Sequence, residues 1–282
     1  MPMMINRIGF MIGMLMQMAL ASGQNATSSK MFTLVNACKE IIWPGIISKG
    51  VDNPGEGFSL NPGETRFRRY PVGWSGRIWA RTGCNFDKEG KGQCQTGSCG
   101  KSLNCSVPSS PPNTIAEFTI GDLDFYDVSL VDGFNVPIAV TPLKGQGDCN
   151  RAGCDGDLRL KCPSELALEY DHKVAACRSA CDVFHNETYC CQEANAAQGP
   201  CLLSNYSTGF RQVCPATSAR EQSFVMTCAA SDYVVAFCAS RNQTVCSYHG
   251  NRLVCSTSSS GMKTMTQNWG ITVLAFLLFS IL

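Results

Sequence analysis

Three aspartates lie within one apolar stretch of the chain, "DFYDVSLVDGFNVPIAV", which begins at Asp124 and also contains Asp127 and Asp132. A fourth acid, Glu117, lies just upstream in "TIAEFTI". Two carboxylates that face a sugar can hydrolyse a glycosidic bond, because one protonates the leaving oxygen while the other activates water or attacks directly. These residue types therefore allow a carbohydrate-processing site in this part of the chain.

The same acids also suit ordinary structural positions. Asp132-Gly133 between two apolar runs is a strong signal for a β-hairpin turn. Asp127 is typical of a sheet edge, where a charge discourages aggregation. Glu117 alternates with apolar neighbours, as residues do on a half-exposed strand. The residues alone leave the catalytic and the structural interpretations open.

The elements that would position these acids are short strands. The aspartate-containing stretch reads as two strands, and further strand patterns occur at residues 31–36, 41–45, 66–81, 114–120, 223–227 and 233–237. Glycine-rich turns separate them, so the pattern favours a mainly β fold, either a sandwich or a flattened barrel. One amphipathic helix is predicted after Pro163, because apolar residues recur there at steps of three and four: Leu166, Tyr170, Val174, Cys177, Cys181 and Phe184.

Eighteen cysteines are the strongest feature of the composition. A zinc site would need cysteines or histidines clustered at ligand spacing, but the closest cysteines are the adjacent pair Cys190-Cys191, and the chain has only three histidines. We therefore expect no metal and no cofactor, and instead a disulfide framework formed in an oxidising compartment. The even number allows every cysteine to pair, which argues against a reactive thiol.

The charge balance argues against several other classes of protein. The chain has 23 Lys and Arg against 22 Asp and Glu. A nucleic-acid partner would require a basic excess or stripe, so none is expected. The sequence also contains no nucleophile elbow, zinc-protease motif or P-loop.

Both ends of the chain carry targeting patterns. A positively charged start, a 13-residue apolar core at 8–20 and small residues after it predict a signal peptide over 1–23. The last 14 residues, 269–282, are apolar and follow a polar spacer and a serine-rich segment. This order predicts a GPI anchor on the outer face of the plasma membrane, with 262–282 removed; a short tail anchor is the alternative. The predicted ω residue is Ser258, or Ser259, Ser260 or Gly261.

Five Asn-x-Ser/Thr sequons are candidate glycosylation sites in a secreted chain: Asn25, Asn104, Asn186, Asn205 and Asn242.

A cysteine-rich segment carries a specific family resemblance. "GKGQCQTGSCG", from Gly90, resembles the signature of the thaumatin-like proteins, the plant pathogenesis-related family that includes thaumatin and osmotin. The likeness covers about residues 31–238 and sixteen cysteines. Other matching segments are "GRIWARTGCNFD" from Gly76, "PPNTIAEFTI" from Pro111, "DFYDVSLVDGFNVPI" from Asp124, "CDVFHNETYCC" from Cys181 and "YVVAFC" ending at Cys238.

The resemblance implies eight disulfides. They are Cys38–Cys238, Cys84–Cys94, Cys99–Cys105, Cys149–Cys228, Cys154–Cys214, Cys162–Cys177, Cys181–Cys190 and Cys191–Cys201. Cys246 and Cys255 lie outside the family set. They are the only two cysteines that the eight family pairs leave over, so we predict a ninth bridge between them. In the chain-entropy model, the long Cys38–Cys238 closure contributes roughly 4–5 kcal/mol.

The resemblance also implies a fold and its division within a thaumatin-like domain over residues 24–240. A flattened β-sandwich core is expected from about 31–82, 107–148 and 215–240. A small disulfide-tied hairpin domain is expected at 83–106 and a helical, disulfide-rich domain at 149–214. A stalk with the extra disulfide would occupy 241–261.

A cleft is expected between the core and the disulfide-rich domain. Antifungal members of the family line it with one Arg, one Glu and three Asp; Arg77, Glu117, Asp127 and Asp132 match four of them. The fifth is missing, because the family's Cys-Pro-Asp is here Cys214-Pro215-Ala216. Its loss should reduce like-charge repulsion, and with it any rise in the pKa of the neighbouring carboxyls. Three aromatics are candidates for stacking against sugar rings: Phe125, Tyr126 and Phe134.

Three functions fit this resemblance. The favoured one is a monomeric, extracellular defence protein, held at the plasma membrane by its GPI lipid, that binds β-glucan or a related wall polysaccharide in the acidic cleft. The second is a weak endo-β-1,3-glucanase with Glu117 and Asp132 as acid and base. The third is a protein-interaction or inhibitor scaffold that does not use the cleft.

Overall fold

A computed structural model of the protein describes residues 28–50, 55–190, 204–220, 222–243, 245–249 and 252–256, the last two by their backbone alone. Several predicted features lie outside these residues: the signal peptide over 1–23, Asn25, the Cys191–Cys201 pair, the ω residues at 258–261 and the tail at 262–282. None of the described helices is long and apolar enough to cross a membrane.

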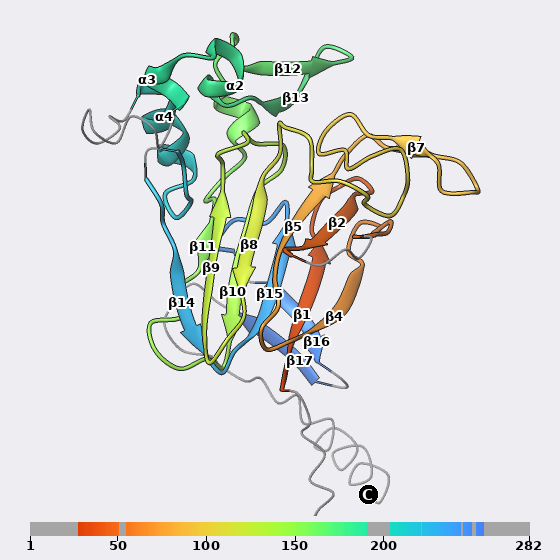
Figure 1. Ribbon diagram of the computed structural model, residues 1–282, viewed down its shortest axis with the longest axis vertical. Coiled ribbons are helices and arrows are strands. Elements are labelled where there is room, and N and C mark those ends of the chain that lie inside the picture. Colours follow the sequence, from red (N-terminus) through yellow and green to blue (C-terminus); the bar gives the residue numbers. More distant parts are fainter. Residues whose placement is uncertain are drawn as a thin grey trace, which may run out of the picture.

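Two β-sheets form the body of the molecule (Figure 1). The five-stranded sheet has the order β11 (Ala152–Gly153), β10 (Ile138–Leu143), β15 (Asp232–Phe237), β1 (Ser29–Asn36) and β4 (Thr65–Pro71). The six-stranded sheet has the order β14 (Met226–Ala229), β9 (Leu123–Ser129), β8 (Ile115–Thr119), β5 (Ser75–Arg81), β2 (Trp43–Ser48) and β3 (Glu56–Gly57). Within these sheets β1 and β15 run parallel, and the other paired strands are antiparallel.

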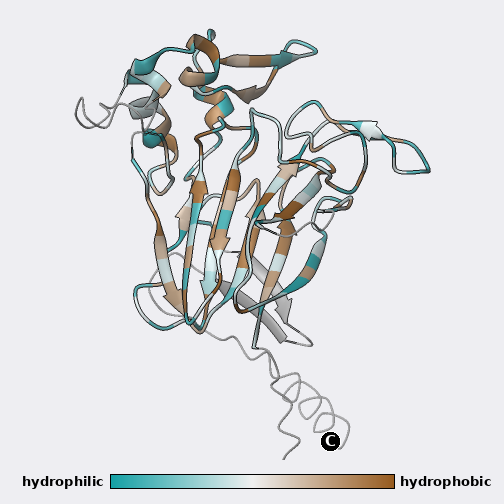
Figure 2. Cartoon of the chain, viewed as in Figure 1, coloured by the Kyte–Doolittle hydropathy of each residue, from teal (hydrophilic) through white to brown (hydrophobic). Residues whose placement is uncertain are grey.

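The main core lies between the two sheets and is rich in aromatic rings. Phe32 on β1 packs edge-on against Phe118 on β8 at a centroid distance of 4.8 Å, and also contacts Tyr70 and Tyr233. Burial of each large apolar side chain contributes about 1.5–3 kcal/mol. Figure 2 shows hydrophobic and hydrophilic residues alternating along the strands, as expected when one face of each sheet is buried. The mainly β sandwich predicted from the strand pattern is therefore confirmed.

Alternation along β9 separates the aspartates of the apolar stretch. Asp124, Tyr126 and Val128 face the core, whereas Phe125 and Asp127 face outward. Asp124 is fully buried and accepts hydrogen bonds from Lys30 Nζ at 3.1 Å and from Tyr233 Oη at 2.8 Å. Because its charge is paired inside the core, Asp124 has a structural role.

The turn at Asp132-Gly133 is real, but the predicted β-hairpin is wrong. The amide of Gly133 donates to the carbonyl of Leu130 at 3.0 Å, and Gly133 has a positive φ of 87°. The strands on either side, β9 and β10, belong to different sheets. The turn therefore carries the chain from one sheet to the other instead of folding it back on its neighbour.

A second prediction, the amphipathic helix after Pro163, is also wrong for most of its length. After the short 3-10 helix η2 (Leu158–Lys161), the chain forms a hairpin of β12 (Ala167–Tyr170) and β13 (Lys173–Cys177). Asp171 and His172 at its tip have φ values of 48° and 59°, which an α-helix cannot contain. Helices follow only at α2 (Ala180–Phe184), α3 (Glu187–Cys190) and α4 (Asn205–Val213), which lie with this hairpin beyond one end of the sandwich (Figure 1).

Seven of the predicted disulfides are present: Cys38–Cys238, Cys84–Cys94, Cys99–Cys105, Cys149–Cys228, Cys154–Cys214, Cys162–Cys177 and Cys181–Cys190. The segment expected to be a stalk contains a hairpin of β16 (Val245–His249) and β17 (Arg252–Ser256). Its backbone register places Cys246 directly opposite Cys255. The ninth bridge stays a prediction, since the side chains of these two strands are not described.

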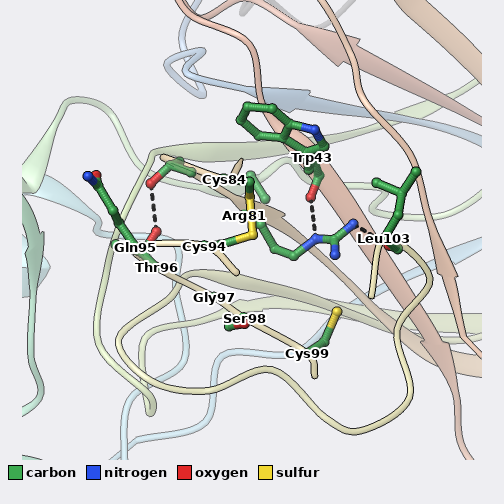
Figure 3. Close-up of a disulfide and its surroundings, with 12 residues drawn as sticks. Trp43, Arg81, Cys84, Cys94, Gln95, Thr96, Gly97, Ser98, Cys99 and Leu103 are labelled. Carbon is green, nitrogen blue, oxygen red and sulfur yellow. Dashed lines mark hydrogen bonds between the residues drawn. A yellow bond between two sulfur atoms is a disulfide. The ribbon is translucent and has the colours of Figure 1, made fainter. Parts of the chain in front are cut away.

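The small hairpin region, with β6 (Asn85–Phe86) and β7 (Gly92–Gln93), is attached to the sheet by a buried arginine (Figure 3). Arg81 at the end of β5 is 1% exposed. Its guanidinium donates to the carbonyls of Trp43 at 2.9 Å and Leu103 at 2.7 Å, and more weakly to those of Pro44 and Ser102. Burial lowers the pKa of Arg81 to about 10, so the side chain remains charged at neutral pH. Carbonyl dipoles thus stabilise this charge and fix the region to the core.

Candidate functional site

Three of the predicted cleft residues lie in one row across the outer face of the six-stranded sheet. The register places Arg77 on β5 opposite Glu117 on β8, and Glu117 opposite Asp127 on β9. Ile47 on β2 extends the row beyond Arg77. Side chains of directly opposed residues leave a sheet on the same side, so strand pairing itself brings this group together.

A salt bridge joins the first two charged residues of the row. Arg77 Nε donates to Glu117 Oε1 at 2.7 Å, and the two side chains are 48% and 32% exposed. Like charges directly opposite one another destabilise a sheet. The guanidinium reduces this repulsion between Glu117 and Asp127, because it supplies a positive charge beside the pair.

Asp127 is the acid of this row whose pKa is shifted. The residue is 8% exposed, and burial raises its pKa to about 6. A hydrogen bond with Ser218 and the charge of Arg77 oppose the rise, whereas the charge of Glu117 adds to it. Asp127 is therefore largely protonated at mildly acidic pH, and it can donate a proton there. The predicted reduction in carboxyl pKa shifts does not apply to this residue, because burial rather than a neighbouring acid is the largest cause.

The row forms the floor of an open cavity of about 490 Å³. Phe125, 45% exposed, lies two residues from Asp127 on the same strand face, and Val225 is 51% exposed beside it. The hydroxyls of Ser75 and Thr119 add a polar pair 3.1 Å apart. This combination of an apolar platform and a few polar groups is typical of small-molecule and sugar sites.

A second cavity, of about 640 Å³, continues the first one. Both are lined by Glu117, Asp127 and Val225, and the second also contains Ser218 and Arg220 from the loop that precedes β14. We call the two cavities together the groove. Its floor is sheet, and the loop with Ser218 forms one wall.

The remaining predicted residues lie elsewhere. Asp132 lines neither cavity of the groove; its carbonyl accepts a hydrogen bond from the amide of Asn113 at 3.1 Å. Ala216, the position of the missing fifth acid, is buried beside Gly153 and also lines neither cavity. The predicted catalytic pair Glu117 and Asp132 is therefore not brought together in the groove.

Of the three candidate stacking aromatics, only Phe125 is available to a ligand. Tyr126 is 1% exposed and Phe134 is 0% exposed, because both side chains point into the interior. Sequence reasoning missed Lys49, Ser218 and Arg220, which also line the groove. They come from segments distant in the chain, and no motif marks them.

The groove was expected to be acidic, but the described side chains that line it include more cations than carboxylates. Three cations, Lys49, Arg77 and Arg220, line it together with two carboxylates, Glu117 and Asp127. The described residues contain no group of three or more His, Cys, Asp or Glu side chains that could hold a metal ion.

Comparison with known proteins identifies the family. The model of the thaumatin family matches residues 36–239. Pathogenesis-related thaumatin-like protein 3.5 of Cryptomeria japonica is 44% identical over 229 residues, which cover 79% of this chain and 95% of the relative. Pathogenesis-related protein 5 of Arabidopsis thaliana is 44% identical over 214 residues, which cover 73% and 89%. A solved thaumatin-like xylanase inhibitor is 26% identical, with a TM-score of 0.43, and the match covers 74% of this chain and 99% of the inhibitor. The chain belongs to the thaumatin family.

Proposed function

We propose that this protein is an extracellular defence protein that binds a cell-wall polysaccharide, β-glucan or a related polymer, in the groove and does not hydrolyse it. The observation that carries this proposal is the position of the exposed ring of Phe125 beside the polar row of Arg77, Glu117 and Asp127. An aromatic face can stack on a sugar ring, while charged and hydroxyl groups bond its edge. The pathogenesis-related names of its relatives support a role in defence and stress responses.

Binding without hydrolysis is favoured by the arrangement of the acids. An acid and a base or nucleophile must flank the scissile bond. Glu117 and Asp127 instead leave neighbouring strands on the same face, and Glu117 is already paired with Arg77. Asp132, the predicted partner of Glu117, does not line the groove.

Pull-down on insoluble laminarin followed by a reducing-sugar assay tests this proposal. We expect binding without sugar release, and Phe125→Ala should weaken binding about two- to tenfold, since an aromatic contact contributes about 0.5–1.5 kcal/mol beyond its buried area. Leu123→Ala is the matched control: Leu123 lies on the same strand, is 46% exposed, and lines neither cavity. Equal loss in both variants would contradict a site at Phe125. If the protein neither binds laminarin nor releases sugar, the result would favour the interaction scaffold.

A weak glucanase is the second candidate, and one observation favours it. Burial raises the pKa of Asp127 to about 6, so this carboxyl can supply a proton at mildly acidic pH, and Glu117 lies opposite it on the neighbouring strand. If sugar is released, Asp127→Asn and Glu117→Gln should abolish the release, and Asp132→Asn should leave it unchanged. The catalytic pair would then be Glu117 and Asp127, in place of the predicted pair of Glu117 and Asp132.

Attachment to the plasma membrane by a GPI lipid is the remaining part of the proposal. The apolar tail over 269–282 and the small residues at 258–261 support it. A phosphatidylinositol-specific phospholipase should release the protein from intact cells, and recovery of the C-terminal peptide by mass spectrometry would contradict this. Four sequon asparagines, Asn104, Asn186, Asn205 and Asn242, are exposed, which suits glycosylation.

A further inference from the structure

The charged side chains that line the groove differ in their exposure to solvent and in whether they have a partner. The side chains of Lys49 and Arg220 are exposed, and neither side chain has a hydrogen-bond or ion-pair partner among the described residues. Glu117 already has the charge of Arg77 against it, and Asp127 is 8% exposed. A ligand that enters the groove therefore meets mainly positive charge from the described side chains.

The cations are spread along the groove. Lys49 follows β2 and is fixed by a hydrogen bond from its amide to the carbonyl of Ser75 at 2.7 Å. From β2 to β9 the floor crosses three strand spacings, ~14 Å. Arg220 lies beyond β9, in a turn whose ends, Ala219 and Gln222, pair through their backbones at 2.9 and 3.2 Å. The spacing suits an extended chain with repeated charges better than a single anion.

Arg77 keeps further donors for such a ligand. A guanidinium has five N–H groups in a planar fork, and the bond to Glu117 uses the one on Nε. The terminal nitrogens of a half-exposed arginine can bind a second carboxylate side-on, which gives charge-assisted bonds about twice as strong as neutral ones.

We infer that the groove selects an acidic polysaccharide, a polymer of uronic acids, over a neutral glucan. The pyranose faces would stack on Phe125, and the ring carboxylates would meet Lys49, Arg77 and Arg220. The inference rests on the proposed function, since it names the chemical class of polysaccharide that the same groove binds. A neutral glucan offers only hydroxyl groups to these cations, and it leaves their charges without partners.

The test compares an acidic polymer with its neutral methyl ester, which has the same backbone, and with a neutral glucan. Binding of the purified protein to polygalacturonate, to its methyl ester and to laminarin is measured at low salt by a pull-down titration. We expect polygalacturonate to bind about tenfold more tightly than either neutral polymer. Because exposed charges are screened over ~10 Å at 0.1 M salt, the preference should shrink as salt is raised. Equal affinity for polygalacturonate and its methyl ester would overturn the inference.

Matched double variants assign the effect to the groove. Lys49→Gln with Arg220→Gln should abolish the preference for the charged polymer. Lys88→Gln with Lys161→Gln removes the same charge from exposed positions that line neither cavity, and should keep the preference. If both double variants lose the preference equally, the polymer is attracted only by the overall charge of the protein, and the assignment of the preference to the groove would be overturned.

The two proposals can fail separately. If laminarin and polygalacturonate bind equally and Phe125→Ala weakens both, polysaccharide binding in the groove stands and the selection for uronic acids fails. If no polymer binds, the proposed function fails as well.

Discussion

Asp127→Asn should stabilise the protein at neutral pH, because the wild-type carboxylate is ionised there in a place that disfavours its charge. Its pKa is about 6 in the folded protein against 3.8 for the ordinary carboxyl, mainly because of burial. Between these two values the folded state binds more protons than the unfolded state, so unfolding free energy falls as pH rises. The difference of about two pH units corresponds to about 3 kcal/mol, as an order of magnitude.

The assay is denaturant unfolding with the disulfides intact, followed by tryptophan fluorescence from pH 4 to pH 7.5. The wild type should lose up to about 3 kcal/mol relative to Asp127→Asn as pH rises from about 4 to above 6, and the difference should stay constant beyond that. Asp122→Asn, at an exposed residue of the turn that joins β8 and β9, is the control and should show no such change. A variant that is less stable than the wild type at pH 7.5, or a difference independent of pH, would refute the assignment.

Three further predictions concern stability and covalent structure. Asp124→Asn should cost about 3–5 kcal/mol of unfolding free energy, because it leaves the largely buried Lys30 without its partner; denaturant unfolding at neutral pH measures this, and a change below 1 kcal/mol would contradict the pairing. Arg81→Met should free the region at 83–106 and cost about 2–4 kcal/mol, because four backbone carbonyls lose their buried donor; faster hydrogen exchange there, with the sheets unchanged, is the expected signal. Non-reducing peptide mapping should recover a peptide that joins Cys246 to Cys255, which face each other across β16 and β17; free thiols at these residues would exclude the bridge.

The elements that follow from residue alternation were predictable from the sequence. Period-two patterns identified strands close to β1, β8 and β15, and the same period explains why Asp124 and Asp127 face opposite sides of β9. The pairing of Arg77 with Glu117 and Asp127 depends on register between strands, which only the family resemblance suggested in advance.

The rest depended on contacts that no local pattern contains. The helical period from Leu166 to Cys177 was accidental, because a tight turn at Asp171 and His172 folds that segment into a hairpin. The turn at Gly133 has the usual hairpin residues, yet it joins two sheets. Lys49 and Arg220 enter the groove from loops, and the closure of those loops is set by the whole fold.

The parallel pair of β1 and β15 has a consequence for how the protein is made. These strands lie side by side in the five-stranded sheet, although they are far apart in the sequence. The disulfide Cys38–Cys238, whose cysteines follow the two strands, spans 200 residues of sequence. Because a ribosome delivers the chain from its N-terminus, β1 must wait for its last-synthesised neighbour before the sheet can close. Until β15 is made, the sheet lacks the strand that lies between β10 and β1, and Cys38 lacks the cysteine with which it pairs.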